Sequence, residues 1–399
     1  MEMNYQFLLW IALILISTKL LGLLCKSINL PEVVGALLAG VILGPSALNL
    51  ITMDGQTGSI LEYMAEMGVI FLMFSAGLDT DLKELKANIG ASFVTALIGV
   101  IVPLIGGALC YGLFFHADVS DYDELLKCIF VGVVLTATSV SITVETLREM
   151  GKLSGKVGTT ILGAAIIDDI LGMVVLAVVS SMKDTSVKPS VVLMKIALYA
   201  VLIVVLFLIC SRMEFVLEKG DHKRRVAIFA IAFCFILAYI SEVGFGIADI
   251  TGAYFAGVML CQSKIKGYVD IKIHDVSTVF FSCIFFASVG LKVSLGGMNT
   301  KIWIFAVLLT LVAIITKMVG CGLGAKICGF TWKESFRTGI GMISRGEVAL
   351  IVAEKGRQCG LISEDLFAPI ILVVIITTLV TPIFLKWAFK SDEKQAVQA

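Results

Sequence analysis

The chain has 399 residues, of which 58% are hydrophobic and only 16% are charged, and its mean hydropathy is +1.00. Because a soluble globular protein carries about 25% charged residues, this composition excludes a soluble protein and a sizeable soluble domain. The 31 Lys and Arg residues balance the 31 Asp and Glu residues, so no net charge points to nucleic acid or to an acidic substrate.

Apolar runs bounded by charges, Gly or Pro predict thirteen membrane-spanning helices, since one span takes about 20 apolar residues. The predicted spans are residues 7–24, 33–50, 60–78, 89–115, 125–146, 157–182, 191–210, 226–239, 248–261, 276–291, 302–325, 335–353 and 367–387. The first run lacks a basic leader and a small-residue cleavage site, so we interpret it as a span. The ten cysteines show no metal or disulfide spacing. The expected fold class is an all-α polytopic membrane protein.

The loops between these spans carry an asymmetric charge. Cytoplasmic loops collect Lys and Arg, and if the amino terminus lies outside, the cytoplasmic loops and tail hold 20 basic residues and the outer loops hold 6. This asymmetry predicts an extracytoplasmic amino terminus and a cytoplasmic carboxyl terminus. Residues 116–124 are then outside and residues 212–225 inside.

Two segments far apart in the chain resemble each other. Residues 35–43 (GALLAGVIL) and 252–260 (GAYFAGVML) are identical at six of nine positions. Small residues at this spacing are also ordinary helix contacts, but a second match follows at nearly the same offset, between Ser75, Gly77, Leu78 and Ser288, Gly290, Leu291. The copies are seven spans apart, an odd number, so they run in opposite directions, as in the inverted repeats of secondary transporters.

The same offset pairs the fifth span with the twelfth, and these are the spans most interrupted by small and polar residues. The interruptions lie at residues 136–141 and 341–346. Substrate sites of inverted-repeat transporters lie near the midplane at interrupted helices. We therefore expect the functional site where these two spans meet.

Five charged residues lie inside predicted spans, where each costs about 2.5–3.5 kcal/mol on insertion scales and usually serves a site. They are Asp168 and Asp169, Lys317, Arg345 and Glu347. At about 1.5 Å of rise per residue, Asp168, Lys317, Arg345 and Thr138 lie about 12–16 Å from the cytoplasmic ends of their spans. This common depth predicts a shared polar layer.

The layer has two interpretations. Arg345 and Glu347 can simply hold the broken twelfth span together. The adjacent aspartates point about 100° apart on a helix, so one can pair with Lys317 while Asp169 faces a cavity and holds either a proton or a cation. Oxygens of Thr138, Ser139 and freed backbone carbonyls suit a hard cation. Competition at one carboxylate is sufficient for cation/proton exchange.

The ordered motifs resemble the monovalent cation/proton antiporter-2 family of bacterial Na⁺/H⁺ exchangers over nearly the whole chain. They are residues 30–45 (LPEVVGALLAGVILGP), 136–143 (TATSVSIT), 167–170 (IDDI), Lys317 and 344–353 (SRGEVALIVA). The resemblance implies an NhaA/NapA-like antiporter fold with two crossing broken helices. It also implies a homodimer in the bacterial cell (inner) membrane that uses no cofactor and exchanges Na⁺ or Li⁺ for H⁺.

Roles for individual residues also come from this resemblance. It implies an elevator-type core at about residues 88–182 and 302–390 and a dimerisation part at about 1–87 and 190–300. Relatives that move potassium often carry a soluble regulatory domain, and we expect none in this chain. Asp169 is then the ion-binding carboxylate, supported by Thr138 and Ser139, and Asp168 is the partner of Lys317 in an electrogenic cycle. Arg345 and Glu347 are structural or gating residues of the core.

Three other functions stay open at this level. K⁺/H⁺ exchange is possible on the same scaffold, because the sequence does not fix the size of the cavity. An intramembrane aspartyl protease needs two carboxylates that converge from separate elements to share a proton, which neighbours on one helix do poorly. A passive channel would conduct without saturation and without uphill flux.

Overall fold

The computed structural model describes residues 5–28, 30–53, 55–118, 120–183, 189–217, 223–263, 266–292, 299–358 and 360–396, and within these ranges all regular structure is helical. The first seven spans are α1 (Gln6–Ser27), α2 (Glu32–Leu43), α3 (Gly55–Asp79), α4 (Leu82–Phe115), α5 (Tyr122–Thr136) with α6 (Val140–Glu149), α7 (Lys156–Lys183) and α8 (Pro189–Leu217). The other six are α9 (Lys223–Tyr239) with the π-helix η1 (Ile240–Phe245), α10 (Asp249–Leu260), α11 (Lys266–Val276) with η2 (Ser277–Phe281) and α12 (Ser282–Leu291), α13 (Thr300–Ile327), α14 (Trp332–Gly341) with α15 (Glu347–Gln358), and α16 (Glu364–Ala396).

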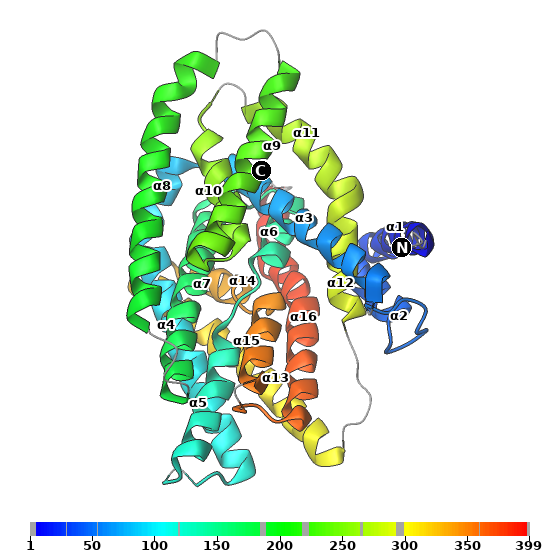
Figure 1. Ribbon diagram of the computed structural model, residues 1–399, viewed down its shortest axis with the longest axis vertical. Helices are drawn as coiled ribbons and strands as arrows, with labels where there is room; N and C mark the ends of the chain where they lie inside the picture. The colour runs from blue at the N-terminus through cyan, green and yellow to red at the C-terminus, as the bar shows by residue number, and fades with distance from the viewer. Residues whose placement is uncertain are drawn as a thin grey trace.

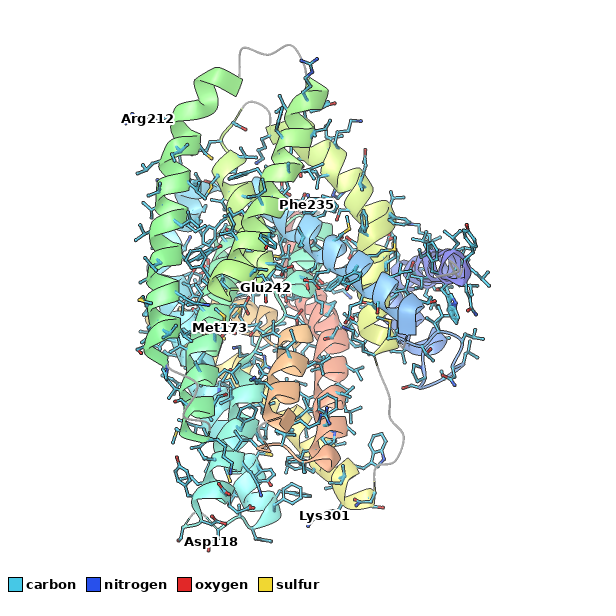
Figure 2. The ribbon with its side chains drawn as sticks, in the orientation of Figure 1. Asp118, Met173, Arg212, Phe235, Glu242 and Lys301 are labelled. Atoms are coloured by element: carbon cyan, nitrogen blue, oxygen red, sulfur yellow. The ribbon has the colours of Figure 1, made fainter. Side chains whose placement is uncertain are left out.

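Each of the thirteen predicted spans is helical in the structure, which confirms the predicted fold class. Ten of the described helical segments are long and apolar enough to cross a membrane, α2 and α10 are shorter apolar helices, and α14 with α15 forms a broken one. Figure 2 shows Arg212 at one end of the molecule and Asp118 and Lys301 at the other, with the long helices running between these ends.

Several predicted helix limits differ from the structure, and two of these differences have a clear local cause. The second span ends at Leu43 and not at residue 50, because Gly44 leaves the helical region (φ −81°, ψ −175°) directly before Pro45, and a residue before proline disfavours the α conformation. The tenth span begins at Lys266 and not at residue 276, because the charged helix α11 continues through the π-helical turn η2 into apolar α12.

The helices form two groups (Figure 1). In the first group, α4 packs along α13, α5 and α7 pack on α4, and α14 and α16 pack on α13. In the second, α2 packs on α1 and α12, α3 packs on α10, α11 and α12, and α9 packs on α10. The first group, α4–α7 with α13–α16, contains both broken spans and is called the core group below.

Two helix crossings in the second group follow the internal repeat. A Cβ atom added to Gly40 of α2 or to Gly290 of α12 would lie less than 3.0 Å from a backbone oxygen of the other helix, and the same holds for Gly77 of α3 and Gly257 of α10. The duplicated motifs that pair α2 with α10 and α3 with α12 therefore make two equivalent crossings, α2 on α12 and α10 on α3. Only glycine permits this approach, so the matching residues are packing residues with a shared origin in the repeat.

Candidate cation site

The fifth span breaks at the residues where the sequence predicts an interruption. Helix α5 ends at Thr136 and α6 begins at Val140, and between them Ala137 (φ −56°, ψ 141°) and Ser139 (φ −92°, ψ 110°) are extended. Threonine and serine hydroxyls compete with the backbone for hydrogen bonds, which weakens a helix that contains several of them. The break frees peptide groups in the interior of the protein, where Thr136, Thr138 and Ser139 are all buried.

The break in the twelfth span crosses the first break. Helix α14 ends at Gly341 and α15 begins at Glu347. The backbone N–H of Ser139 donates to the carbonyl of Ser344 at 2.8 Å, and the hydroxyl of Ser344 donates to the carbonyl of Ser139 at 2.9 Å. A Cβ on Gly346 would lie less than 3.0 Å from Ser139. These contacts fix the two breaks against each other.

A buried lysine joins the sixth span to the first break. The Lys317 ammonium of α13 donates to Asp168 Oδ1 at 2.7 Å and to the carbonyl of Thr136 at 2.8 Å, and the Lys317 and Asp168 side chains are both 0% exposed. Thr136 is the last residue of α5, so the ammonium also lies at the negative end of that helix dipole. The ion pair that the resemblance implies is thus present, with a backbone carbonyl as an additional partner.

Helix α7 places the two aspartates beside the first break. It packs against α5, α6 and α14, and Asp168 shares the Lys317 ammonium with Thr136. Asp169, the next residue, is buried, as are Thr138 and Ser139. Within the described ranges, the Thr138 hydroxyl and Asp168 Oδ2 are buried and have no hydrogen-bond partner. The first break and the neighbouring part of α7 therefore present oxygen atoms that remain available to a ligand.

At the second break, peptide groups are bonded by the Arg345 side chain and by two residues of α16. The Arg345 guanidinium donates to the carbonyls of Ile343 at 3.2 Å and Met342 at 3.4 Å, at the end of α14. The Arg345 N–H donates to the Thr377 hydroxyl at 3.2 Å, and the Thr378 hydroxyl donates to the Arg345 carbonyl. These bonds join Arg345 to the end of α14 and to α16. Glu347 begins α15, and its side chain lies outside the described residues.

Thr377 and Thr378 of α16 are residues that the sequence interpretation overlooked. Two adjacent threonines in an otherwise apolar span were the available signal, as in the fifth span. The described residues contain no group of three or more His, Cys, Asp and Glu side chains that could hold a metal ion. A cation at the first break would therefore be held by the carboxylates of α7 together with hydroxyl and carbonyl oxygens.

The Thr138 hydroxyl gives a first prediction. If it is a cation ligand, Thr138→Ala raises the KM for the cation about tenfold, the size expected for one lost hydrogen bond or ligand to a charged group, and changes the maximal rate less. Thr378→Ala is the matched control, because it removes a buried threonine hydroxyl at the second break. We expect the control to keep the wild-type KM in proteoliposome exchange assays. A Thr138→Ala variant with an unchanged KM would remove Thr138 from the site.

Two crossing broken helices with a buried Asp–Lys pair beside them define a secondary transporter of the cation/proton antiporter class. Residues 12–391 match the family model described as "Sodium/hydrogen exchanger, transmembrane". The chain belongs to this sodium/hydrogen exchanger family.

Individual relatives agree with the family assignment. The chain is 39% identical to the Na⁺/H⁺-K⁺ antiporter GerN of Bacillus cereus over 394 residues, 98% of both chains. It is 35% identical to a Na⁺/H⁺ antiporter of Enterococcus hirae over 390 residues, 96% of this chain and 98% of that one. Its fold matches the sodium proton antiporter MjNhaP1 of Methanocaldococcus jannaschii with a TM-score of 0.75 at 19% identity, over 98% and 97% of the two chains.

The family settles several expectations. The protein is a multi-pass membrane transporter that exchanges monovalent cations for protons. It is not an enzyme, so the aspartyl protease interpretation is excluded. The fold is that of an all-helical antiporter like MjNhaP1.

Proposed function

We propose that the protein exchanges Na⁺ or Li⁺ for H⁺ at Asp169. The observation that carries this proposal is the open set of oxygens at the first break, the Thr138 hydroxyl and Asp168 Oδ2, next to a second buried carboxylate. A buried carboxylate is disfavoured as a bare anion, so it binds either a proton or a cation. Either ligand then excludes the other, which is the condition for coupled exchange.

Lys317 gives the proposed cycle its electrical character. Its ammonium bonds Asp168 in the structure. If cation binding at Asp169 engages Asp168 as well, the ion pair opens and Lys317 releases its proton. Two protons then exchange for one monovalent cation, and one net charge crosses the membrane in each cycle.

Sodium is the favoured cation, and potassium is the second candidate. The names of the relatives from Bacillus cereus and Enterococcus hirae both include Na⁺, whereas K⁺ appears in the former only. Purified protein in liposomes, with Na⁺, Li⁺ and K⁺ tested separately for cation-dependent proton flux, decides between them. Flux with K⁺ at least equal to that with Na⁺ would contradict the proposed selectivity.

The proposed motion is an elevator in which residues 88–182 and 302–390 move against residues 1–87 and 190–300. The packing of α4–α7 with α13–α16 as one group supports this division. A homodimer formed through the second part, in a bacterial cell membrane, belongs to the same proposal.

The membrane orientation gives a second prediction. Single cysteines are introduced at Ala117 and at Arg212, on a background without the native cysteines. A membrane-impermeant thiol reagent should label the first from outside the cell and the second only from the cytoplasmic side, since basic residues concentrate around Arg212. The reverse pattern would contradict the charge-based orientation.

A further inference from the structure

The end of α6 is tied to the second group of helices through Arg148. Its guanidinium Nη2 lies 3.1 Å from Asp79 Oδ2 of α3 and 3.3 Å from Asp270 Oδ1 of α11. The same nitrogen donates to the Ser75 hydroxyl of α3, which in turn donates to Asp270 Oδ1 at 2.8 Å. The Arg148 side chain is only 15% exposed. One arginine thus bonds two helices that do not belong to the core group.

The neighbouring residue adds a link to a third helix. The Glu149 carboxylate accepts the backbone N–H of Glu32 at 2.9 and 3.2 Å. Glu32 is the first residue of α2, so a carboxylate here also stabilises the positive end of that helix dipole. Arg148 and Glu149 together attach the end of α6 to α2, α3 and α11.

Helix α6 carries this attachment at one end and the first break at the other. It is a ten-residue helix, about 15 Å long, that starts directly after Thr138 and Ser139. A displacement of the cation site along the membrane normal therefore displaces Arg148 by a similar distance. Bonds as short as those to Asp79 and Asp270 cannot persist through such a displacement.

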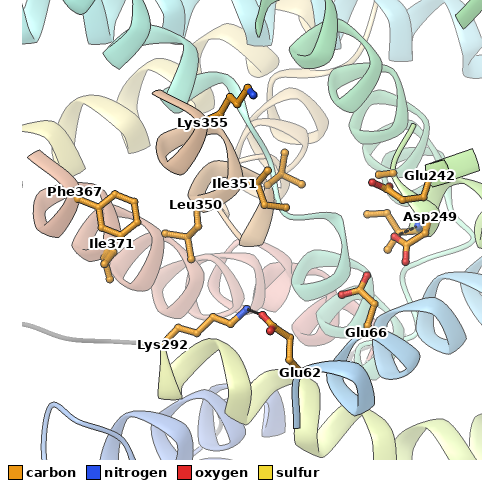
Figure 3. A pocket seen from close by; sticks show the side chains of 13 residues that line it. Glu62, Glu66, Glu242, Asp249, Lys292, Leu350, Ile351, Lys355, Phe367 and Ile371 are labelled. Atoms are coloured by element: carbon orange, nitrogen blue, oxygen red, sulfur yellow. Dashed lines mark hydrogen bonds and ion pairs between the residues drawn. The ribbon is translucent and has the colours of Figure 1, made fainter. Parts of the chain in front are cut away.

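The counterpart of α6 in the repeat is α15, and its surroundings are different. α15 runs toward the opposite end of the molecule (Figure 1). A cavity of about 800 Å³ lies between α15 and α16 on one side and α3, η1 and α10 on the other, with Ile351 and Lys355 on the α15 wall and Glu242 and Asp249 facing them (Figure 3). Cavities of about 610 and 580 Å³ also border Arg148, so the end of α6 is distinguished by its bonds to α2, α3 and α11 and not by a lack of space.

We propose that Arg148 is a latch that holds the transporter in the conformation with the α15 face open, and that its release lets the cation site open toward the α6 face. Inverted repeats exchange their conformations when access alternates, so the state with α15 docked is the state with α6 undocked. Arg148 then sets the ratio of the two states and acts on exchange without contacting the cation. This inference rests on the proposed alternating-access exchange.

The test measures how open the cavity is. A single cysteine replaces Ile351, which lines the cavity and is 64% exposed, on a background without the native cysteines, and its reaction with an impermeant thiol reagent is timed without a cation gradient. Loss of a partly exposed ion-pair network shifts a two-state equilibrium about fivefold. Arg148→Gln should therefore slow labelling, about threefold where the two states start equally populated and by less where the state with the α15 face open is favoured.

Two further variants separate a latch from a general structural role. Asp270→Asn removes the negative charge that Arg148 contacts on α11, without altering α6, and should also slow labelling. Lys152→Gln removes a positive charge just beyond the end of α6 from an exposed side chain, and should leave the labelling rate at the wild-type value. Unchanged or faster labelling in both Arg148→Gln and Asp270→Asn would overturn the proposal.

Exchange assays on the same proteins keep the latch distinct from the proposed function. With the latch weakened, we expect the KM for the cation presented at the α15 face to rise while the KM at the α6 face falls. A wild-type protein without cation-dependent proton flux would contradict the proposed function. The labelling rates would still decide whether Arg148 holds the α15 face open.

Discussion

Replacing Asp169 by Asn is expected to abolish coupled exchange while the protein still folds and inserts into the membrane. Asparagine keeps the shape of the side chain but can neither titrate nor bind a cation through a charge. Because cation and proton are proposed to compete for this carboxylate, its loss removes both halves of the cycle. Proton flux driven by a Na⁺ gradient in liposomes should fall at least a hundredfold, equal to about 2.7 kcal/mol or more in transition-state free energy.

The control for this variant is a carboxylate at the surface. Asp118 lies at one end of the molecule (Figure 2), where its side chain accepts the backbone N–H of Ser120 at 2.9 Å. Asp118→Asn preserves that acceptor and should retain wild-type flux. Wild-type rates in Asp169→Asn, with correct insertion, would remove Asp169 from the centre of the mechanism.

Replacing Lys317 by Gln is expected to remove the electrical response of transport. The change leaves Asp168 buried without its cation, and breaking a buried ion pair in this way costs about 3–5 kcal/mol unless the carboxylate becomes protonated. A permanently protonated Asp168 contributes no charge to the cycle. The variant is therefore expected to be inactive, or to exchange cations for protons without net charge movement.

Currents on solid-supported membranes measure this directly. A wild-type cycle that moves one net charge responds to an imposed potential by about 2.3 kcal/mol for each 100 mV. Lys301→Gln is the control, because Lys301 lies at the exposed beginning of the same helix α13 and should keep its current. An active wild type without current, or an undiminished current in Lys317→Gln, would show that Lys317 does not couple charge to transport.

The sequence predicts the helices well because each span is an average over about 20 residues, and one unexpected residue hardly changes that average. The same property hides local detail. Gly44 and Pro45 end α2 seven residues early, and the charged helix α11 extends the tenth span beyond its apolar part. Both departures depend on a few residues that a hydropathy average absorbs.

From the sequence, the charged residues of the candidate site could be identified, but not the bonds that they make. Charged residues inside apolar spans identify Asp168, Asp169, Lys317 and Arg345, since each is costly unless it is used or bonded. That Lys317 bonds the Thr136 carbonyl, and that Thr377 and Thr378 complete the second break, depends on contacts between distant segments. No periodicity in the sequence encodes these contacts.

Arg148 is another residue whose contacts could not be predicted from the sequence. From the sequence alone, it is an ordinary basic residue beyond the end of the fifth predicted span, and nothing near it in the chain distinguishes it from Lys152. Its partners Asp79 and Asp270 lie 69 and 122 residues away, so only the folded arrangement shows that it joins two groups of helices.

Binding of Na⁺ to the purified protein, measured by calorimetry at several pH values, tests most directly whether cation and proton share one carboxylate. Competition at Asp169 alone predicts an apparent Kd that rises about tenfold for each unit of pH lowered below the pKa of the site, and about a hundredfold if Lys317 also releases its proton, together with proton release on binding. Asp169→Asn should show neither effect. A Kd for Na⁺ that stays constant across that pH range, or Na⁺ binding without proton release, would contradict the proposed mechanism.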